Sequence, residues 1–207
     1  IIAAIVTYNR SALLSRCIDN ILMQSRMPDE IVVINNGSTD DTEDMLRSRG
    51  IRCITQENVG SAGGWHRAIS ISIEENFEAV WLMDDDGFPH KNALLHLEKE
   101  LRPTVACAAS LVLQENKPDR FVFDMPKLNQ SNLPIIFSLT RKYSTISALE
   151  VNSQGGIYKF AQLFNGALIS TDAVKNIGNI NTEYFIYGDE VDFFFRLREA
   201  GDVISVL

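Results

Sequence analysis

Short apolar runs alternate with stretches of helical periodicity along the first half of the chain. Unbroken apolar runs of a few residues are typical of strands buried on both faces of a parallel sheet. They predict strands at residues 1–6, 31–34, 51–55, 80–83 and 105–109. The stretches between them predict a helix after Ser11, a short helix ending at Gly50, a helix running towards Asn76 and a helix at residues 91–101. This alternation predicts an α/β fold with a parallel sheet.

The alternation stops in the second half of the chain. Residues 114–156 contain scattered prolines, Asn and Ser, and follow neither the helix nor the strand period. We expect this segment to be either an excursion that shapes a substrate surface or a partly disordered insertion. Regular structure is expected to return with a strand at residues 160–170 interrupted by Asn165-Gly166, a helix capped by Thr171 or Asp172 that ends at Gly178, a helix at residues 193–200, and a last strand reaching Val206.

Composition indicates one soluble globular domain. The chain has 207 residues, of which 45% are hydrophobic and 22% charged, and no apolar run approaches the roughly 18 residues of a membrane span. The net charge of -8 disfavours nucleic acid as a partner. Cys17, Cys53 and Cys107 lack disulfide or CxxC spacing, so we expect buried thiols and a cytoplasmic protein, including one bound peripherally at the inner face of the membrane. No signal peptide is evident, and both ends are expected to be trimmed.

Three acids in a row, Asp84-Asp85-Asp86, follow the apolar run that ends at Met83. Adjacent carboxylates repel one another unless a positive charge lies between them. A hard divalent cation with oxygen ligands, Mg²⁺ or Mn²⁺, is the simplest such partner, and open α/β sheets bind ligands at the carboxyl ends of their strands. The alternative is a polar turn in which Asp caps a helix.

The segment from Gly60 to Gly64 is rich in glycine and precedes Arg67. Backbone N–H groups at a helix start, together with the charge of Arg67, can hold a phosphate. Glycines serve tight packing of a helix on a sheet equally well, and both interpretations stay open. The segment is not a P-loop, because no Gly-Lys-Ser/Thr follows it. It is not the dinucleotide-binding fingerprint, because the glycine spacing differs and the segment follows the third predicted strand.

A second pair of acids, Asp189-Glu190, follows the aromatic run Tyr184-Phe185-Ile186-Tyr187. Carboxylates at a helix start are favoured by the helix dipole, which is a purely structural explanation. The apolar neighbours favour a partly dry cleft, in which a carboxylate takes a proton from a hydroxyl as a general base. Asp192 and Arg196 have the spacing of an ion pair along the same helix.

In this order the features resemble the inverting family 2 glycosyltransferases, which have the nucleotide-diphospho-sugar-binding GT-A fold. The resemblance covers essentially the whole chain and is carried by Thr7-Tyr8-Asn9-Arg10, the Asn35 to Asp40 loop, the Asn58 to Arg67 segment, Asp84-Asp85-Asp86 and Asp189-Glu190. The glycine segment and the acid cluster resemble most closely the galactofuranosyl- and rhamnosyltransferase branch. The resemblance implies a Rossmann-like mixed sheet flanked by helices. It implies one catalytic domain over residues 1–207, with a nucleotide-sugar-binding half at 1–110 and an acceptor-side half at 111–207.

The resemblance also implies a role for each matching residue. The donor would contact Thr7, Tyr8, Asn9, Arg10, Asn36, Asn58, Gly60, Gly63, Gly64, Arg67, Asp84 and Asp85. Asn36 stands where relatives often place an Asp against the base. Asp84 and Asp86 would ligate Mn²⁺ or Mg²⁺, with a further His ligand beyond residue 207. Of the catalytic pair Asp189 and Glu190, the second acid would deprotonate the acceptor hydroxyl, although relatives usually have Glu-Asp in this order.

The implied function is transfer of a sugar from a UDP- or dTDP-linked donor to a glycan or lipid-linked acceptor in polysaccharide or cell-surface glycan synthesis. A metal that neutralises the departing diphosphate and one base on the acceptor side suit a single displacement with inversion. Two alternatives remain. A metal-dependent nucleotidyltransferase is expected to carry a glycine-rich loop with a basic residue where this chain has Thr7 to Arg10. A non-catalytic sugar-nucleotide- or glycan-binding module would keep its role without Glu190.

Overall fold

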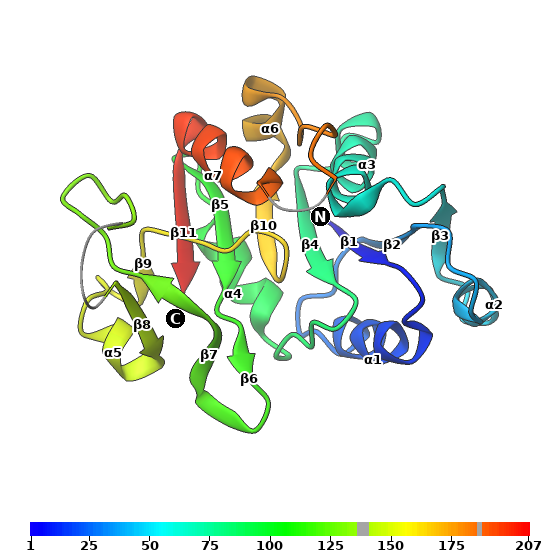
Figure 1. The fold of residues 1–207 in the computed structure, drawn as a ribbon, viewed down its shortest axis with the longest axis horizontal. Helices are drawn as coiled ribbons and strands as arrows, with labels where there is room; N and C mark the ends of the chain where they lie inside the picture. The colour runs from blue at the N-terminus through cyan, green and yellow to red at the C-terminus, as the bar shows by residue number, and fades with distance from the viewer. Residues whose placement is uncertain (136–140, 186–187) are drawn as a thin grey trace.

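A mixed sheet forms the centre of the protein in the computed structural model, which describes residues 1–135, 141–185 and 188–207 (Figure 1). Within these residues eight strands pair in the order β3-β2-β1-β4-β10-β5-β11-β9. Their bounds are β1 (Ile2–Thr7), β2 (Glu30–Asn35), β3 (Arg52–Thr55), β4 (Ala79–Asp84), β5 (Val105–Ser110), β9 (Ile157–Tyr158), β10 (Ala167–Ser170) and β11 (Asp202–Val206). Strands β10 and β9 are antiparallel to their neighbours, and the others run parallel. The predicted α/β fold and its first five strands are confirmed.

Helices cover both faces of the sheet. One face carries α1 (Ser11–Leu22), α2 (Thr42–Ser48) and α4 (Ala93–Glu100), and the other carries α3 (Gly60–Glu74), α6 (Thr171–Ile177) and α7 (Asp189–Ala200) (Figure 1). Strand β4 shows why its sequence is apolar throughout: Trp81 and Met83 pack under α1 and α4, whereas Val80 and Leu82 pack under α3. Burial on both faces leaves no position for a polar side chain until the strand ends at Asp84.

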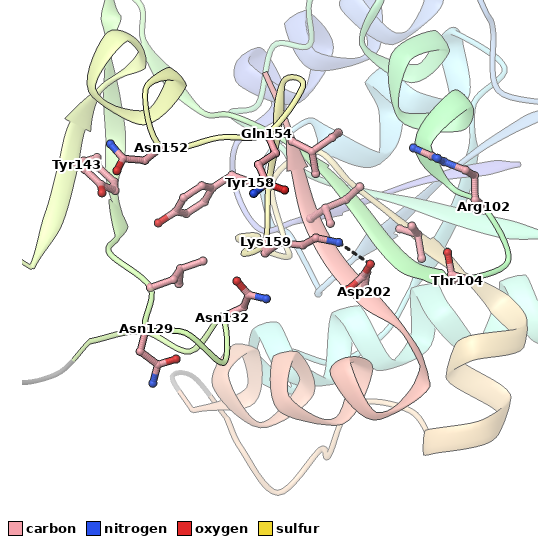
Figure 2. Close-up of a pocket in the computed structure, with 14 residues that line it drawn as sticks. Arg102, Thr104, Asn129, Asn132, Tyr143, Asn152, Gln154, Tyr158, Lys159 and Asp202 are labelled. Carbon is pink, nitrogen blue, oxygen red and sulfur yellow. Dashed lines mark hydrogen bonds and ion pairs between the residues drawn. The ribbon is translucent and has the colours of Figure 1, made fainter.

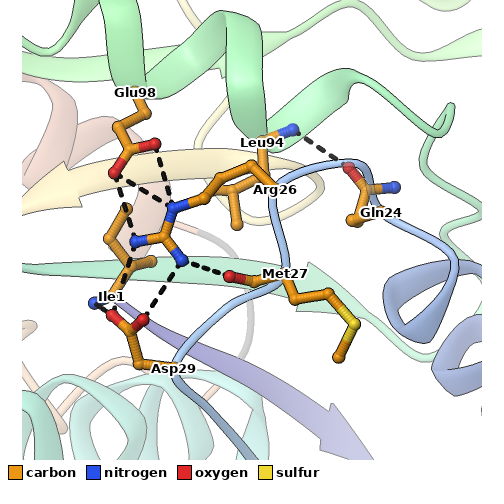
Figure 3. Close-up of polar contacts among 7 residues, drawn as sticks. All are labelled: Ile1, Gln24, Arg26, Met27, Asp29, Leu94 and Glu98. Carbon is orange, nitrogen blue, oxygen red and sulfur yellow. Dashed lines mark hydrogen bonds and ion pairs between the residues drawn. The ribbon is translucent and has the colours of Figure 1, made fainter.

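The end of α1 is tied to α4 by side-chain hydrogen bonds (Figure 3). Gln24 is 4% exposed, and its Oε1 accepts from the Leu94 N–H at 3.1 Å while its Nε2 donates to the His90 carbonyl at 2.9 Å. Arg26 forms ion pairs with Glu98 and Asp29, both at 3.1 Å. The Gln24 bonds contribute more, because exposed ion pairs add little stability.

A second, smaller sheet lies at one end of the large sheet (Figure 1). It consists of β6 (Leu113–Gln114), β7 (Lys117–Pro126) and β8 (Lys142–Thr145), followed by α5 (Ile146–Glu150). Phe121, Met125, Leu149 and Tyr158 form a separate hydrophobic cluster beneath it. The expectation of a partly disordered insertion is therefore wrong for residues 114–135 and 141–156; residues 136–140 lie outside the described part. Strand β7 was not predicted, because Pro118 and Pro126 suggested an irregular segment. The two prolines lie near the ends of the strand, where few ladder hydrogen bonds are lost.

Two further expectations were wrong in detail. The strand predicted at residues 160–170 is formed only by Ala167–Ser170, because Gly166, with φ of 88°, ends an irregular segment there. The cap of α6 is Ser170, whose Oγ accepts from the Ala173 N–H at 3.3 Å, rather than Thr171 or Asp172. Cys17 and Cys107 are buried thiols as predicted, whereas Cys53 is only partly buried.

Candidate active site

The carboxyl ends of the parallel strands bring the polar motifs together at one edge of the sheet. Thr7 ends β1, and its hydroxyl donates to Asp85 Oδ2 at 2.8 Å in a buried position. The backbone N–H of Asn36, just after β2, donates to the Thr7 carbonyl at 3.0 Å. Motifs that are far apart in the sequence therefore share one hydrogen-bonded edge, as expected for an open α/β sheet.

Asp85 connects the acid cluster to the turn after β1. It is 5% exposed, and its second oxygen accepts from Arg10 Nη1 at 3.2 Å; the same nitrogen reaches Asp86 Oδ2 at 3.1 Å. The carboxylates of Asp85, and more weakly Asp86, raise the pKa of Arg10, whereas burial raises the pKa of Asp85. Both Asp85 oxygens are engaged within the protein, so this residue fixes Arg10 and the turn.

Asp84, at the end of β4, is the acid whose environment least suits a negative charge. Burial, and then the carboxylates of Asp86, Asp85 and Glu190, raise its pKa to about 7. Within the described part of the chain, its side chain has no hydrogen-bond partner. A buried carboxylate crowded by other acids is stabilised by a cation. Mg²⁺ is commonly held by one or two carboxylates plus substrate phosphates, so Asp84 and Asp86 fit such an ion.

The loop after β2 is fixed against the turn after β1. Asn9, at a φ of 55°, accepts on Oδ1 from the Thr39 N–H at 2.7 Å, and its own N–H donates to Ser38 Oγ at 2.9 Å. Tyr8 beside it is 47% exposed. The two loops are thus joined by hydrogen bonds into one polar surface, from which the side chain of Tyr8 is exposed to solvent.

The glycine segment forms the first turn of α3 and packs closely against its surroundings. A Cβ on Gly64 would lie 2.6 Å from Val6 Cγ1, and one on Gly63 would lie 2.3 Å from Val59 Cγ2. The Asn36 side chain donates to the Gly60 carbonyl at 3.1 Å, and Asn58 Oδ1 accepts from the Gly60 N–H at the same distance. These contacts support the packing interpretation and still leave a helix N-terminus at this edge.

Arg67 lies one to two turns farther along α3. Its guanidinium pairs with Glu74 at 3.4 Å in an exposed position. The side chain therefore extends towards the C-terminal end of the helix. This geometry gives no support to a phosphate contact by Arg67.

Gly60→Ala is expected to lower the free energy of unfolding by about 3 kcal/mol, from left-handed backbone strain and overpacking together. Gly60 has a φ of 77°, and a Cβ there would lie 2.0 Å from the Phe185 carbonyl oxygen. Gly50→Ala is the matched control, because Gly50 has a φ of 65° and nothing within 4 Å of its Cβ position. Urea unfolding should show a loss of only about 1 kcal/mol for the control. Equal losses would show that the close contact at Gly60 is unimportant.

A pocket of about 460 Å³ opens beside Asp84. It lies between the start of α3, the end of β4, β7, the irregular segment before β10 and the start of α7. The lining residues are Ser61, Trp65, Asp84, Phe123, Gln162, Phe164, Asn165, Gly188, Asp189, Glu190 and Val191. The first and second acidic motifs, about 100 residues apart in the sequence, therefore face the same cavity.

The two acids of the second motif occupy different environments at the predicted helix start. Glu190 Oε1 accepts from the Leu163 N–H at 2.9 Å, and burial raises the pKa of Glu190. Asp189 is 4% exposed, burial raises its pKa, and its Oδ2 has no hydrogen-bond partner among the described residues. Asp192 instead pairs with Arg196 at 2.7 Å, as predicted. Ile186 and Tyr187, part of the aromatic run before this helix, lie outside the described residues.

Several lining residues were not predicted from the sequence. Trp65 stacks on Phe164, with ring centroids 5.1 Å apart. Asn165 packs on the acid turn so closely that a Cβ on Gly87 would lie 2.3 Å from its Oδ1. Asn165 could have been identified from the sequence, because it interrupts an apolar run. Phe123 and Gln162 lie in no pattern that indicates a role in the site.

No group of three or more His, Cys, Asp or Glu side chains is arranged as a metal site within the residues that the structure describes. No helix in the described ranges is long and apolar enough to cross a membrane.

Comparisons with known proteins identify relatives over nearly the whole chain. The chain is 28% identical over 203 residues to galactofuranosyltransferase GlfT1 of Mycolicibacterium smegmatis, covering 96% of this chain and 65% of the relative. It is 28% identical over 209 residues to GlfT1 of Mycobacterium tuberculosis, covering 97% and 65%. The chain thus spans 65% of the length of these relatives.

Solved structures show the same fold. The mannosyltransferase PcManGT of Pyrobaculum calidifontis, solved with GDP-Man and Mn²⁺, has a TM-score of 0.64 at 18% identity, covering 99% of this chain and 53% of that one. The predicted GT-A fold is therefore confirmed. The sequence model of glycosyl transferase family 2 matches residues 3–159, and the chain belongs to this family.

Proposed function

We propose that this chain carries the active site of a metal-dependent, inverting glycosyltransferase. The donor would be a UDP- or dTDP-linked sugar, with a galactofuranosyl unit favoured by the names of the curated relatives. The acceptor would be a hydroxyl of a glycan or lipid-linked glycan in polysaccharide synthesis. The observation that carries the proposal is that Asp84 and Glu190 line one pocket.

The donor nucleotide would lie along the edge formed by the first three strand ends. Exposed Tyr8 and the fixed loop around Asn9 would border the base and ribose. Asn36 would support the donor site without touching the donor, because it is 4% exposed and both ends of its carboxamide are hydrogen-bonded, to Gly60 and Gln56. Asn58, Gly60, Gly63 and Gly64 would bring the first turn of α3, with its backbone N–H groups, near the diphosphate.

Asp84 and Asp86 would hold the cation on the donor diphosphate, and Asp85 would orient Arg10 beside them. When bound, Mn²⁺ or Mg²⁺ neutralises negative charge that builds on the departing diphosphate. Arg10 supplies a second, fixed positive charge, because its Nη1 lies between the Asp85 and Asp86 carboxylates. Asp84 then faces the reacting sugar from the pocket side.

Glu190 would take the proton of the acceptor hydroxyl as the sugar is transferred. The Leu163 N–H fixes one of its oxygens and leaves the other for the acceptor. Its raised pKa brings it closer to neutral pH, where a general base is more effective. With no covalent nucleophile required, one displacement inverts the anomeric centre. Residues 1–110 would thus form the donor half and residues 111–207 the acceptor-side half.

A screen of nucleotide sugars tests the proposal directly. The protein is incubated with UDP-galactofuranose, other UDP-sugars and dTDP-rhamnose, with Mn²⁺ or with EDTA, and released nucleotide and transferred sugar are measured. We expect Mn²⁺-dependent release with at least one donor and an inverted product with a galactan acceptor. A retained configuration, or equal turnover in EDTA, would contradict the proposed mechanism.

Phe123→Ser is expected to raise the KM for the acceptor about five- to tenfold, because an apolar side chain at a binding surface contributes ~1 kcal/mol when covered. Phe123 lines the pocket from β7 and is 53% exposed, so its loss should leave the core intact. The KM for the donor should not change. Steady-state kinetics with each substrate varied in turn measures both.

Val122→Ser is the matched control for this prediction. Val122 neighbours Phe123 on β7, is 47% exposed and does not line the pocket. Its replacement should change neither KM. If Phe123→Ser weakens the donor and acceptor alike, β7 belongs to the donor site and the division into two halves is wrong.

A further inference from the structure

A second pocket, of about 550 Å³, lies between the small sheet and the outer strands of the large sheet (Figure 2). Tyr158 of β9 projects into it between Asn152 and the loop that carries Asn129 (Figure 2). Strands β11 and β9 form one wall, and β8 and the loop after β7 form the other. None of the acids of the candidate active site lines this pocket.

The loop at residues 129–132 is held in one conformation. Asn129 Oδ1 accepts from the Ser131 N–H at 2.9 Å and from the Leu133 N–H at 3.0 Å. From outside, Arg198 of α7 donates to the Ser131 carbonyl at 2.9 Å and to the Asn132 carbonyl at 2.6 Å. The pocket wall is therefore preformed, which lowers the ordering cost of binding.

The charged residues of the pocket are already paired. Lys159 Nζ lies 2.6 Å from Asp202 Oδ2 (Figure 2), and Arg102 pairs with Glu100. Each charged side chain of the lining thus has an oppositely charged neighbour, and none is left to attract an ion of one sign. This balance favours a neutral ligand over an ion.

The remaining lining is rich in groups that form neutral hydrogen bonds. Four carboxamides, from Asn129, Asn132, Asn152 and Gln154, accompany two tyrosines. The side chain of Gln154 is exposed, and neither it nor the Tyr143 hydroxyl has a hydrogen-bond partner within the described residues. The Tyr158 hydroxyl donates to the Pro126 carbonyl at 2.6 Å, which holds its buried ring in the wall of the pocket. Amides beside the partly exposed ring of Tyr143 suit a ligand with many hydroxyls and apolar ring faces.

We infer that this pocket is a second carbohydrate-binding site, which takes a neutral oligosaccharide at a distance from the reacting hydroxyl. Its identification with the acceptor glycan rests on the proposed function. An acceptor chain that binds in both pockets would gain affinity because two weak binding sites are linked in one ligand. The contacts with Asp84 and Glu190 would stay the same. A short acceptor would reach only the pocket beside Asp84.

The site is tested with a galactofuranose hexasaccharide, titrated into isotope-labelled protein without metal or nucleotide. We expect the side-chain amide signals of Gln154 and Asn132 to shift. The double variant Tyr143→Phe with Gln154→Ala should bind the hexasaccharide about fivefold more weakly, because it loses two hydrogen-bonding groups. Gln130→Ala is the matched control, since Gln130 is an exposed amide outside the pocket and should bind like wild type.

Kinetics supplies a second readout. The double variant should raise the KM for the hexasaccharide and leave kcat and the KM for a galactofuranose disaccharide unchanged. Unshifted Gln154 and Asn132 signals, or wild-type affinity in the double variant, would overturn the inference. If no sugar is transferred to any acceptor, the proposed function fails, and the titration alone still decides whether this pocket binds carbohydrate.

Discussion

Asp84→Asn should reduce the affinity for UDP in Mn²⁺ by about a hundredfold or more, because a metal contributes several kcal/mol to holding a diphosphate. Asparagine keeps the shape of the side chain and removes its charge. Calorimetric titration of UDP with Mn²⁺, and again with EDTA, measures the metal-dependent part of the affinity. In EDTA the variant and the wild type should bind UDP equally weakly.

The fold should tolerate this change. Asp84 is crowded by Asp86, Asp85 and Glu190, and their charges oppose its ionisation. Replacing it by a neutral side chain removes this repulsion, so the melting temperature without metal should stay the same or rise. A loss of UDP binding then cannot be attributed to unfolding.

Asp41→Asn is the control for the loss of one negative charge near the same edge. Asp41 is an exposed residue directly before α2, and its side chain makes no cap hydrogen bond. It should keep the Mn²⁺-dependent affinity for UDP. If Asp84→Asn also keeps it, the cation is not held at the end of β4.

The first half of the fold follows from the sequence because local and global signals agree there. Residues 1–110 alternate buried strands with helices, and each strand is apolar on both faces, as Trp81 and Leu82 show on opposite sides of β4. In such a segment, periodicity, turn residues and chain order all indicate the same parallel arrangement.

The second half follows less well, because its strands are defined by tertiary contacts. β7 exposes most of its side chains and buries Phe121 and Met125 against Leu149 and Tyr158, which come from distant segments. β10 is inserted antiparallel between β4 and β5, although it follows β5 in the chain by more than 50 residues. Neither arrangement leaves a local pattern in the sequence.

The residues of the candidate site also divide into those with a local sequence pattern and those placed only by tertiary contacts. Asp84, Asp86 and Glu190 were found as motifs, because carboxylates directly after an apolar run or at a helix start need an explanation. Phe123 and Gln162 line the same pocket without any such pattern, since their roles depend on which segments fold against α7. The sequence indicates the chemistry, and the tertiary packing decides which side chains surround it.

The choice between Asp189 and Glu190 as general base depends on geometry at the start of α7. Asp189 is 4% exposed and its Oδ2 has no partner in the described ranges, so it is the less accessible acid. Glu190 is held by the Leu163 N–H and lines the pocket with Asp84. A base must reach the acceptor hydroxyl when the donor is in place, which favours the acid with one fixed and one available oxygen.

Glu190→Gln is therefore expected to lower kcat for transfer by about a hundredfold to ten-thousandfold, the usual contribution of a general base. The glutamine Oε1 can still accept from the Leu163 N–H, so the side chain should stay in place. Affinity for UDP in Mn²⁺ should be unchanged, because the base acts on the acceptor. Single-turnover transfer at saturating donor and acceptor measures the chemical step directly.

Two controls make this result specific. Glu199→Gln changes an exposed acid on the same helix and should keep wild-type kcat. Asp189→Asn tests the neighbouring acid. If this variant abolishes transfer while Glu190→Gln retains it, the base is Asp189, the first acid of the pair, and not the second as the resemblance implies. If both variants keep wild-type transfer, the acids at the start of α7 serve only the helix dipole, and the acceptor proton leaves by another route.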